Sequence, residues 1–263
     1  MRLYWEVAKR SFQRQLAYRA ATLAGLVTNA FFGYLRGAVF IALFATRPEV
    51  SGWDVRDALT YTWLTQALIM IVQMWGGWEI SDNIKTGDVA SDLSRPFEYY
   101  VYWLARDLGR AAYHVLARGF PTLLIGFFFY DLLLPPAPTI WPLLAVTLTL
   151  SVVMSFAFRF LVNVTAFWLL DIQGVAAVVG VGMMFLSGFM VPVVFFPGWL
   201  QTVVEWLPFA GIVMLPIEVY LGKVTGMALL VELGRYAVWA AVLIAAGRLA
   251  LAAGERRLVV QGG

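Results

Sequence analysis

Residues Ser187–Gly222 read SGFMVPVVFFPGWLQTVVEWLPFAGIVMLPIEVYLG and close a long apolar region of the chain. Within residues 132–204, only Arg159 and Asp171 are charged. No soluble core needs so long a run, because a bilayer span takes about 20 apolar residues and this region has room for at least two. Hydrocarbon cannot satisfy the backbone groups that proline and glycine leave free, so their frequency in Ser187–Gly222 predicts broken helices that pack inside protein or line a cavity. The sequence therefore indicates a membrane protein of the kind that forms channels or transporters.

The composition excludes several other classes of protein. Hydrophobic residues make up 61% of the chain and charged residues 13%, about half the charged share of a soluble domain. The net charge of +3 is too small to indicate a nucleic-acid partner. There is no cysteine, and the one histidine, His114, stands apart from any metal-ligating cluster. No Ser-His-Asp set or carboxylate pair can be assembled within the membrane, so we expect neither a catalytic site nor a bound metal or cofactor in this chain.

The hydropathy pattern predicts an all-α integral membrane protein with six transmembrane helices. The expected spans are Ala21–Ala45, Ala58–Gly77, Tyr113–Leu134, Ile140–Leu170, Gly174–Val194 and Met227–Ala253. The fourth is too long for a straight span and is expected to run past the bilayer. An even number of spans places both termini on the same side of the membrane.

Basic residues set the orientation of these spans. They gather before the first span, between the second and third or just inside the third, and at the end of the chain: Arg2, Lys9, Arg10, Arg14, Arg19, Lys85, Arg95, Arg106, Arg110, Arg118, Arg248, Arg256 and Arg257. The positive-inside rule therefore predicts cytoplasmic termini in a plasma membrane, the inner membrane if the source is bacterial. The loop after the second span is then cytoplasmic, and Ser187–Gly222 lies toward the outer face.

Residues 1–20 form an amphipathic element ahead of a single six-span domain, residues 21–263. The apolar face of residues 1–20 is formed by Leu3, Tyr4, Trp5, Val7, Phe12 and Leu16. Because basic side chains would meet the lipid headgroups beside them, we expect an interfacial helix here. An ordinary basic flank that only orients the first span is the alternative. Basic residues continue through the first 19 positions with no cleavage site, so we expect no cleavable signal peptide.

The predicted cytoplasmic loop, residues 79–110, mixes acidic and basic residues and then becomes aromatic. Gly87 is expected to end a helix, and Ser94-Arg95-Pro96 to break the chain before a new one. Aromatic residues that follow are expected at the membrane surface, namely Phe97, Tyr99, Tyr100 and Tyr102. A mere connection is the alternative, but the length and aromatic content favour a docking surface for a cytoplasmic partner.

Two motifs resemble those of a known family. After the second span the pattern GD-x4-L-x-RP begins at Gly87 and ends at Pro96. After the fifth span, Ser187–Gly222 follows SG-x2-VP-x3-FP-x10-PF and then P-x-E-x-YLG, which is the more specific of the two. With the topology of nearly the whole chain, they resemble the membrane subunits of ABC-2 type export permeases, in the branch of short six-span proteins.

That resemblance implies a transport subunit without enzymatic activity of its own. In the family two permease subunits pair, each binds an ATPase subunit through a short coupling helix in the first cytoplasmic loop, and a re-entrant hairpin closes the outer end of the pathway. The resemblance assigns ATPase coupling to Gly87, Asp88, Leu93, Arg95, Pro96 and Phe97. It assigns the outer gate, in and around the hairpin at residues 195–222, to Gly188, Pro192, Phe195, Phe196, Pro197, Pro208 and Phe209.

A motor for such a pump would have to be another polypeptide, because this chain has no phosphate-binding loop of the form G-x-x-x-x-G-K-[ST]. ATP and magnesium would then be bound by the partner ATPase. Two other classes stay open. A secondary transporter also uses broken helices, although no internal repeat relates the halves of this chain. A noncatalytic membrane scaffold is the third class. Binding of a separate ATPase and ATP-dependent transport distinguish the three.

Polar side chains within the expected spans are candidates to line the pathway. An ionised group at mid-bilayer costs about 3 kcal/mol or more unless it is paired or hydrated, so such residues should face the bundle interior or a cavity. The candidates are Asn29, Arg36, Gln66, Gln73 and Asn163. Arg159 is expected near the cytoplasmic boundary. For Arg36, a structural pair with a carboxylate, or a position near the interface, is the alternative to a pathway role.

Overall fold

The computed structural model describes residues 2–169 and 171–257, and within these residues the chain is helical with no β-strand. The α-helices are α1 (Arg2–Gln15), α2 (Arg19–Thr46), α3 (Val55–Ile71), α4 (Glu79–Thr86), α5 (Asp88–Leu93), α6 (Tyr99–His114), α7 (Phe120–Phe129), α8 (Ile140–Val164), α9 (Gln173–Leu186), α10 (Gly198–Trp206), α11 (Ala210–Tyr220) and α12 (Gly226–Glu255). A π-helical turn, η1 (Val115–Gly119), joins α6 to α7, and 3-10 turns lie at η2 (Thr165–Phe167) and η3 (Val193–Phe195). The predicted all-α class is confirmed.

Within the described residues, four helical segments are long and apolar enough to cross a bilayer: Arg19–Thr46, Tyr99–Phe129, Ile140–Phe167 and Gly226–Glu255. The pair α10 and α11, bent by 103°, makes a fifth if it is counted as one broken span. The predicted second and fifth spans correspond to α3 and α9, with 17 and 14 residues. Both fall short of the ~20 residues of a full span, so six spans stay a prediction.

The third span begins earlier than its predicted limits, Tyr113–Leu134. The helix starts at Tyr99 and continues through η1 into α7, so the end of the predicted loop 79–110 is helical. The π turn precedes Pro121, which has no N–H to donate to a regular α-helical ladder. Tyr99 and Tyr100 are buried rather than at the membrane surface, because they pack against the aromatic side chains of α8.

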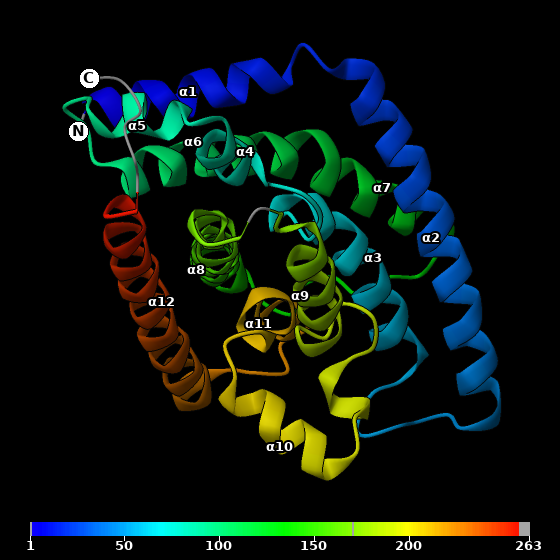
Figure 1. Ribbon diagram of the computed structural model, residues 1–263. Helices are drawn as coiled ribbons and strands as arrows, with labels where there is room; N and C mark the ends of the chain where they lie inside the picture. The colour runs from blue at the N-terminus through cyan, green and yellow to red at the C-terminus, as the bar shows by residue number, and fades with distance from the viewer. Residues whose placement is uncertain (1, 170, 258–263) are drawn as a thin grey trace, which may run out of the picture.

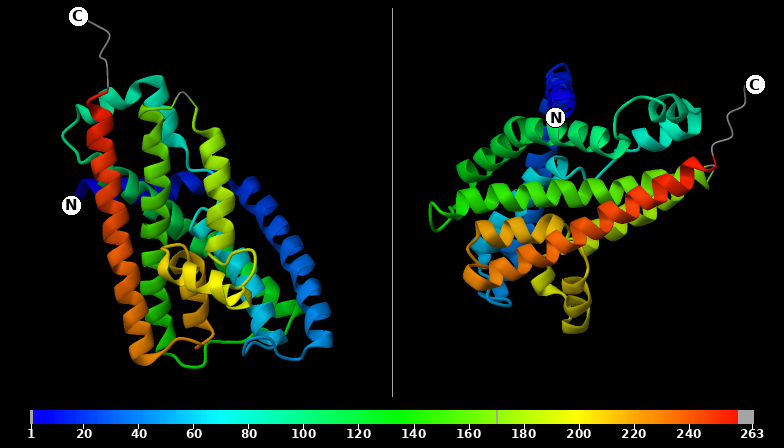
Figure 2. Two further views of the ribbon diagram at one scale, coloured as in Figure 1. Left: turned by 60° about the horizontal axis from the view of Figure 1, so that its bottom comes forward. Right: turned by 90° about the vertical axis from the view of Figure 1, so that its left-hand side faces the viewer.

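The helices α8 and α12 run side by side, and α11 packs against both and against α3 (Figures 1 and 2). In both views of Figure 2, α1 lies across the direction of α8 and α12. That orientation suits a helix at the membrane surface. A helix is present within residues 1–20, namely α1, and it ends at Gln15 before α2 begins at Arg19, whereas its place at the membrane surface stays a prediction.

Close contact between α1 and α6 depends on one glycine. A Cβ atom at Gly109 of α6 would fall well inside van der Waals contact with the carbonyl group of Ala8 in α1. The hydroxyl of Ser11 then donates a 2.7 Å hydrogen bond to the carbonyl of Arg106. Phe12 meets Tyr113 edge to face, with ring centroids 5.7 Å apart. These contacts hold α1 directly against α6 between Arg106 and Tyr113.

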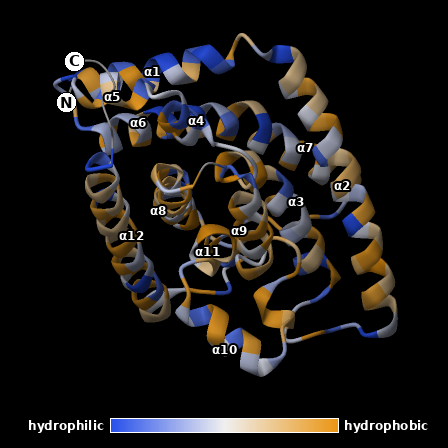
Figure 3. Ribbon diagram, viewed as in Figure 1, coloured by the Kyte–Doolittle hydropathy of each residue, from blue (hydrophilic) through white to orange (hydrophobic). Residues whose placement is uncertain are grey.

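Three apolar clusters make up the interior of the described residues. The largest fills the space among α3, α8 and α11, and a third, with Trp63 at its centre, lies between α3 and α7. A smaller apolar cluster lies at the other end of α8, where Ile80, Val89, Tyr100, Phe160 and Leu251 meet. Figure 3 shows hydrophilic residues gathered at α1, α4 and α5, whereas α2 and α12 are largely hydrophobic along their lengths. Several apolar side chains of α2 are also exposed, as expected for a helix that faces lipid.

Candidate functional site

The α4–α5 element is a compact helical corner. Gly87 has φ of 82°, a left-handed conformation that glycine adopts without strain and that lets α5 start where α4 ends. Two side-chain hydrogen bonds close the corner, from Thr86 to Asp88 and from Asn83 to Asp92, both at 2.7 Å. The helix end predicted at Gly87 is therefore confirmed, and Asp88 begins α5 with its carboxylate exposed.

The chain breaks between α5 and α6 as predicted at Ser94-Arg95-Pro96. Leu93 packs against the smaller apolar cluster, whereas Arg95 and Pro96 are exposed. The Phe97 ring lies 4.8 Å from that of Tyr102. Glu98 then caps α6, because its carboxylate accepts a 2.7 Å hydrogen bond from the N–H of Val101.

Asn163 of α8 holds the start of α4. Its amide oxygen accepts a 2.9 Å hydrogen bond from the N–H of Ser81, and its amide nitrogen donates one of 2.9 Å to the carbonyl of Gly77. Lys85 adds an ion pair of 3.1 Å with Asp171 at the other end of α4. Asn163, expected to line the pathway, is thus engaged in fastening α4 to α8.

Next to this attachment lies a buried charged group. The carboxylate of Asp107 in α6 bonds Arg110 and Arg159, each at 2.9 Å. All three side chains are at most 10% exposed. Arg159 also donates a 3.0 Å hydrogen bond to Gln73, which follows α3 with φ of 49°. Gln73, another pathway candidate, is therefore part of this group and lies outside a regular helix.

Arg110 connects the charged group to the end of α3. Its guanidinium donates hydrogen bonds to the backbone carbonyls of Met70 and Ile71, the second at 2.9 Å. These carbonyls belong to the last helical turn, whose acceptors have no partner within the helix. The same side chain thus caps α3 and pairs with Asp107, so α3, α6 and α8 are joined through one arginine.

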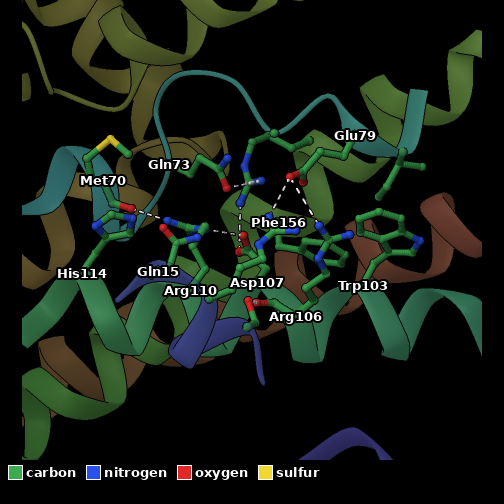
Figure 4. Close-up of a pocket in the computed structure, with 15 residues that line it drawn as sticks. Gln15, Met70, Gln73, Glu79, Trp103, Arg106, Asp107, Arg110, His114 and Phe156 are labelled. Carbon is green, nitrogen blue, oxygen red and sulfur yellow. Dashed lines mark hydrogen bonds and ion pairs between the residues drawn. The ribbon is translucent and has the colours of Figure 1, made fainter. Parts of the chain in front are cut away.

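A second carboxylate, Glu79, completes the cluster at the first turn of α4. It lies 3.5 Å from both Arg14 of α1 and Arg106 of α6. The Arg106 guanidinium also lies 4.5 Å from the centre of the Trp103 ring, a cation–π contact. Figure 4 shows Glu79, Arg106 and Asp107 around one pocket, which has a volume of about 190 Å³.

Arg36, the most distinctive pathway candidate, ties α2 to the segment after α9. Its guanidinium donates hydrogen bonds to Thr65 at 3.0 Å and to the carbonyls of Phe189 and Met190 at 2.8 and 3.0 Å. Tyr61 lies under the guanidinium, which is 5.7 Å from the centre of its ring. Neutral oxygen atoms and an aromatic ring therefore surround Arg36, rather than the carboxylate of a structural ion pair.

Asn29 and Gln66 are brought together in the same part of the bundle. Asn29 of α2 donates a 3.0 Å hydrogen bond to the backbone carbonyl of Gln66 in α3. Its amide oxygen accepts one of 3.2 Å from Arg118. Asn29 and Gln66 are 4% and 3% exposed, so both are buried, and Asn29 contacts α3 and Arg118.

Residues Ser187–Gly222, predicted to lie toward the outer face and called the outer segment below, are held by aromatic packing. Phe195 packs against Phe40, Phe44 and Trp53, with ring centroids 5.8 to 6.4 Å apart. Phe196 stacks on Phe185 at 4.9 Å with an interplanar angle of 12°. The predicted broken helices are present. Breaks in the helical structure coincide with Gly188, Pro192, Pro197 and Pro208.

Phe209, directly before α11, packs on a different helix from Phe195 and Phe196, the other aromatic gate candidates. Its ring lies 5.1 Å from that of Phe158 in α8, edge to face. Almost all of α11 is buried, whereas α10 exposes Trp199 and Trp206. The outer segment thus combines a buried helix with one at the edge of the bundle, as Figure 1 shows.

Sequence reasoning did not single out the central charged residues. Asp107 and Arg110 fell within a stretch interpreted as a solvated loop, and Arg159 was expected at a membrane boundary. One signal was present, because Arg106, Asp107 and Arg110 are spaced to share a helix face with charges of opposite sign. Their partner Arg159 is 52 residues from Asp107, so the pairing itself could not be read from local spacing.

A family model described as "ABC-2 family transporter protein" matches residues 33–262 of this chain. The match covers α4–α5, the outer segment and the residues of α4, α6 and α8 that line the charged pocket, whereas α1 lies before the matched range. No curated protein matches the chain.

Proposed function

Since this chain belongs to the ABC-2 family of transporter membrane proteins, we propose that it is the permease subunit of an ATP-driven exporter whose ATPase is a separate polypeptide. ATP and magnesium would bind to that ATPase. The observation that carries the proposal is the α4–α5 corner, which is exposed on one side and fastened to α8 on the other. It meets the need of a pump whose motor must push on a stiff cytoplasmic element.

The exposed side of α4–α5 has the charge for a docking surface. A hollow of about 330 Å³ beside α4 and α5 is lined by Glu79, Asp82, Asp88 and Asp92. Such an acidic hollow complements a basic patch on an ATPase subunit, because complementary charges favour encounter and fix orientation. Arg95, exposed after α5, adds a guanidinium at the rim of this surface. We assign the coupling contact to the segment from Gly87 to Phe97.

A displacement of α4 would pass directly to the membrane helices. Asn163 binds the start of α4 to α8, and Glu79 connects it to α1 and α6 through two arginines. The charged group at Asp107 then extends the connection to the end of α3. Because the contacts of Asn163 and of the Asp107 group are short and buried, α3, α4, α6 and α8 are expected to move together as one body.

The exposed side of α9 suits contact with a second permease subunit. Around Gly180 and Gly182, within 4 Å of where a Cβ atom would lie, the structure has no other atom, and Val178 and Val181 are exposed. Small residues beside apolar ones allow close approach of another helix in a membrane. Gly33 of α2, by contrast, already packs against Trp63 of its own chain. Two permease subunits with the pathway between them are therefore our proposal, in a plasma membrane with both termini cytoplasmic.

The outer aromatic segment is proposed as the gate at the far end of that pathway. Phe195 and Phe196 seal it by ring contacts alone, and the neighbouring prolines prevent a continuous helix that would resist movement. We propose that residues 195–222 form a re-entrant hairpin, which enters and leaves the membrane on the outer side. Because such a hairpin does not cross the membrane, its aromatic side chains could move while the spanning helices stay in place.

The coupling assignment is tested by replacing Arg95 and Phe97 with alanine. We expect weaker association with the ATPase, or ATP hydrolysis that no longer drives transport, with membrane insertion intact. Affinity purification and transport into inside-out vesicles measure the two effects. The matched control replaces Arg47 and Phe128, exposed residues away from α4–α5, and should keep both properties. Normal assembly and coupled transport in the first variant would exclude the coupling role.

A further inference from the structure

The pocket between α1, α6 and α8 carries more positive than negative charge. Its inner part contains the group in which Asp107 bonds both Arg110 and Arg159. One carboxylate therefore faces two guanidinium groups, which leaves one positive charge without a counterion. Since burial of an unbalanced charge is costly, this part of the pocket favours an anion.

The mouth of the pocket repeats the same arrangement. Glu79 lies between Arg14 and Arg106, 3.5 Å from each. The side chains of Arg14 and Glu79 are 54% and 56% exposed, whereas that of Arg106 is 23% exposed. The pocket thus opens at Arg14 and Glu79. Four arginines and two carboxylates line it, so it has an excess of two positive charges. Figure 4 shows Glu79, Arg106, Asp107 and Arg110 facing one space.

His114 supplies a second, independent indication of a ligand. It lines the same pocket, is 5% exposed, and its Nδ1 atom has no hydrogen-bond partner among the described residues. Buried polar atoms without partners are rare in folded proteins, and a polar group bound in the pocket would give this nitrogen a partner. Figure 4 places His114 at one end of the pocket and Trp103 at the other.

The pocket lies where α8 adjoins the start of α4. The helical segment Ile140–Phe167 has 28 residues and is about 42 Å long, which exceeds the ~30 Å hydrocarbon core. A helix of this length extends beyond the hydrocarbon, and the charged end at α4–α5 is the end suited to the lipid headgroups. The α1 helix crosses the direction of α8 and exposes Leu3 and Trp5, apolar side chains suited to the interface. Arg14 of this helix is at the mouth of the pocket.

From this geometry we propose that the pocket binds a phosphate group. Guanidinium groups match phosphate through paired, charge-assisted hydrogen bonds, and four arginines line this space. Its volume of about 190 Å³ exceeds the ~30 Å³ occupied by one water, so a tetrahedral phosphate fits with ordered waters. The phosphate belongs either to the headgroup of an anionic lipid or to a soluble phosphate. Bound there, the phosphate would link Arg14 of α1 to the buried group of Asp107, Arg110 and Arg159.

The test uses the full chain in a phosphate-free, lipid-depleted detergent. Binding of phosphatidic acid and of diacylglycerol, which differ only in the phosphate, is measured by native mass spectrometry. Binding of inorganic phosphate is measured by calorimetry. The decisive variant is Arg14→Gln, and its matched control is Arg10→Gln, an exposed arginine one turn away on α1 outside the pocket. Both remove the same charge from the same helix.

We expect phosphatidic acid or inorganic phosphate to bind, and diacylglycerol not to bind. Arg14→Gln should raise the dissociation constant at least about fivefold, and Arg10→Gln less than about twofold. Arg106→Gln should weaken binding more than Arg14→Gln does. Binding of phosphatidic acid alone identifies a lipid headgroup, and binding of inorganic phosphate identifies a soluble source. Absence of binding by both, or equal weakening by Arg10→Gln and Arg14→Gln, would overturn the proposal.

Discussion

The two ends of this molecule are held together by different forces. Next to α4–α5, buried arginines and a carboxylate at most 10% exposed join α3, α6 and α8, and the more exposed Arg14–Glu79 pair connects α1 to α4. At the outer end, Phe195 and Phe196 pack through rings, and Pro192, Pro197 and Pro208 interrupt the helices. Hydrogen-bonded charges fix direction and distance, whereas ring packing tolerates sliding. The difference suits an end that receives force and an end that rearranges.

The largest expected effect comes from Asp107→Asn. This change leaves Arg110 and Arg159 buried without their shared carboxylate, and loss of one partner from a buried ion pair costs about 3–5 kcal/mol. Thermal unfolding in detergent measures the loss. The matched control is Asp131→Asn, whose partner Arg56 is 3.0 Å away in an exposed pair, and it should cost less than about 1 kcal/mol. Equal losses in the two variants would show that the charged group does not hold this end together.

An intermediate effect is expected when both Phe195 and Phe196 are changed to alanine. Removing two packed rings should lower the stability of the protein, and solutes should leak through vesicles that contain the complex. Solute flux is compared at equal protein content. Alanine at Phe128 and Phe129, an exposed pair on α7, is the control and should produce neither effect. A folded variant with normal coupling and no leak would exclude a gate at this position.

A smaller effect is expected from Gly109→Ala. The added methyl group would overlap the carbonyl of Ala8, so α1 must shift at a cost of about 1–3 kcal/mol. Limited proteolysis of α1 detects the shift. Gly234→Ala, at a position with no neighbouring atom within 4 Å of the added group, is the control. If α1 is equally protected in both variants, close packing of α1 on α6 is not needed to hold it.

The smallest effect concerns the exposed ion pair between Lys85 and Asp171. A hydrogen bond from the backbone N–H of Gln173, and then one from Lys85, lower the pKa of the Asp171 carboxyl below its ordinary value. A lowered pKa means that the contribution is complete above the unfolded value, about 3.9, and is lost as pH falls through the folded value. The stability difference between wild type and Asp171→Asn should therefore be complete at pH 6 and shrink as pH falls below the unfolded value. Thermal unfolding at pH 6 and at pH 3 checks this, and a difference that is as large at pH 3 as at pH 6 would contradict it.

Local signals in the sequence predicted the features that depend on neighbouring residues. Gly87 ends α4 because a left-handed residue is needed there, and Pro192, Pro197 and Pro208 coincide with breaks between helices, although Pro216 lies inside α11. Apolar runs likewise predicted the helical membrane class. Each of these depends on residues within a few positions along the chain.

Features that depend on distant residues were missed. Charges around Asp107 resemble a solvated loop until Arg159, from another helix, is brought beside them. Tyr99 and Tyr100 likewise resemble interfacial aromatics until α8 supplies Phe160 to pack against. Such pairings are set by tertiary packing, which also determines that α3 and α9 are shorter than full spans.

Cross-linking tests the central claim most directly, namely that α4–α5 receives force from a separate ATPase. The chain has no cysteine, so a single Asp88→Cys change creates one reactive site in the coupling segment. Trp199→Cys places the same thiol on the exposed side of α10, in the outer segment that we propose as the gate. We predict that Asp88→Cys forms a cross-link with the ATPase subunit in membranes and that Trp199→Cys does not. A cross-link from Trp199→Cys alone, or from neither site in an active complex, would contradict the assignment.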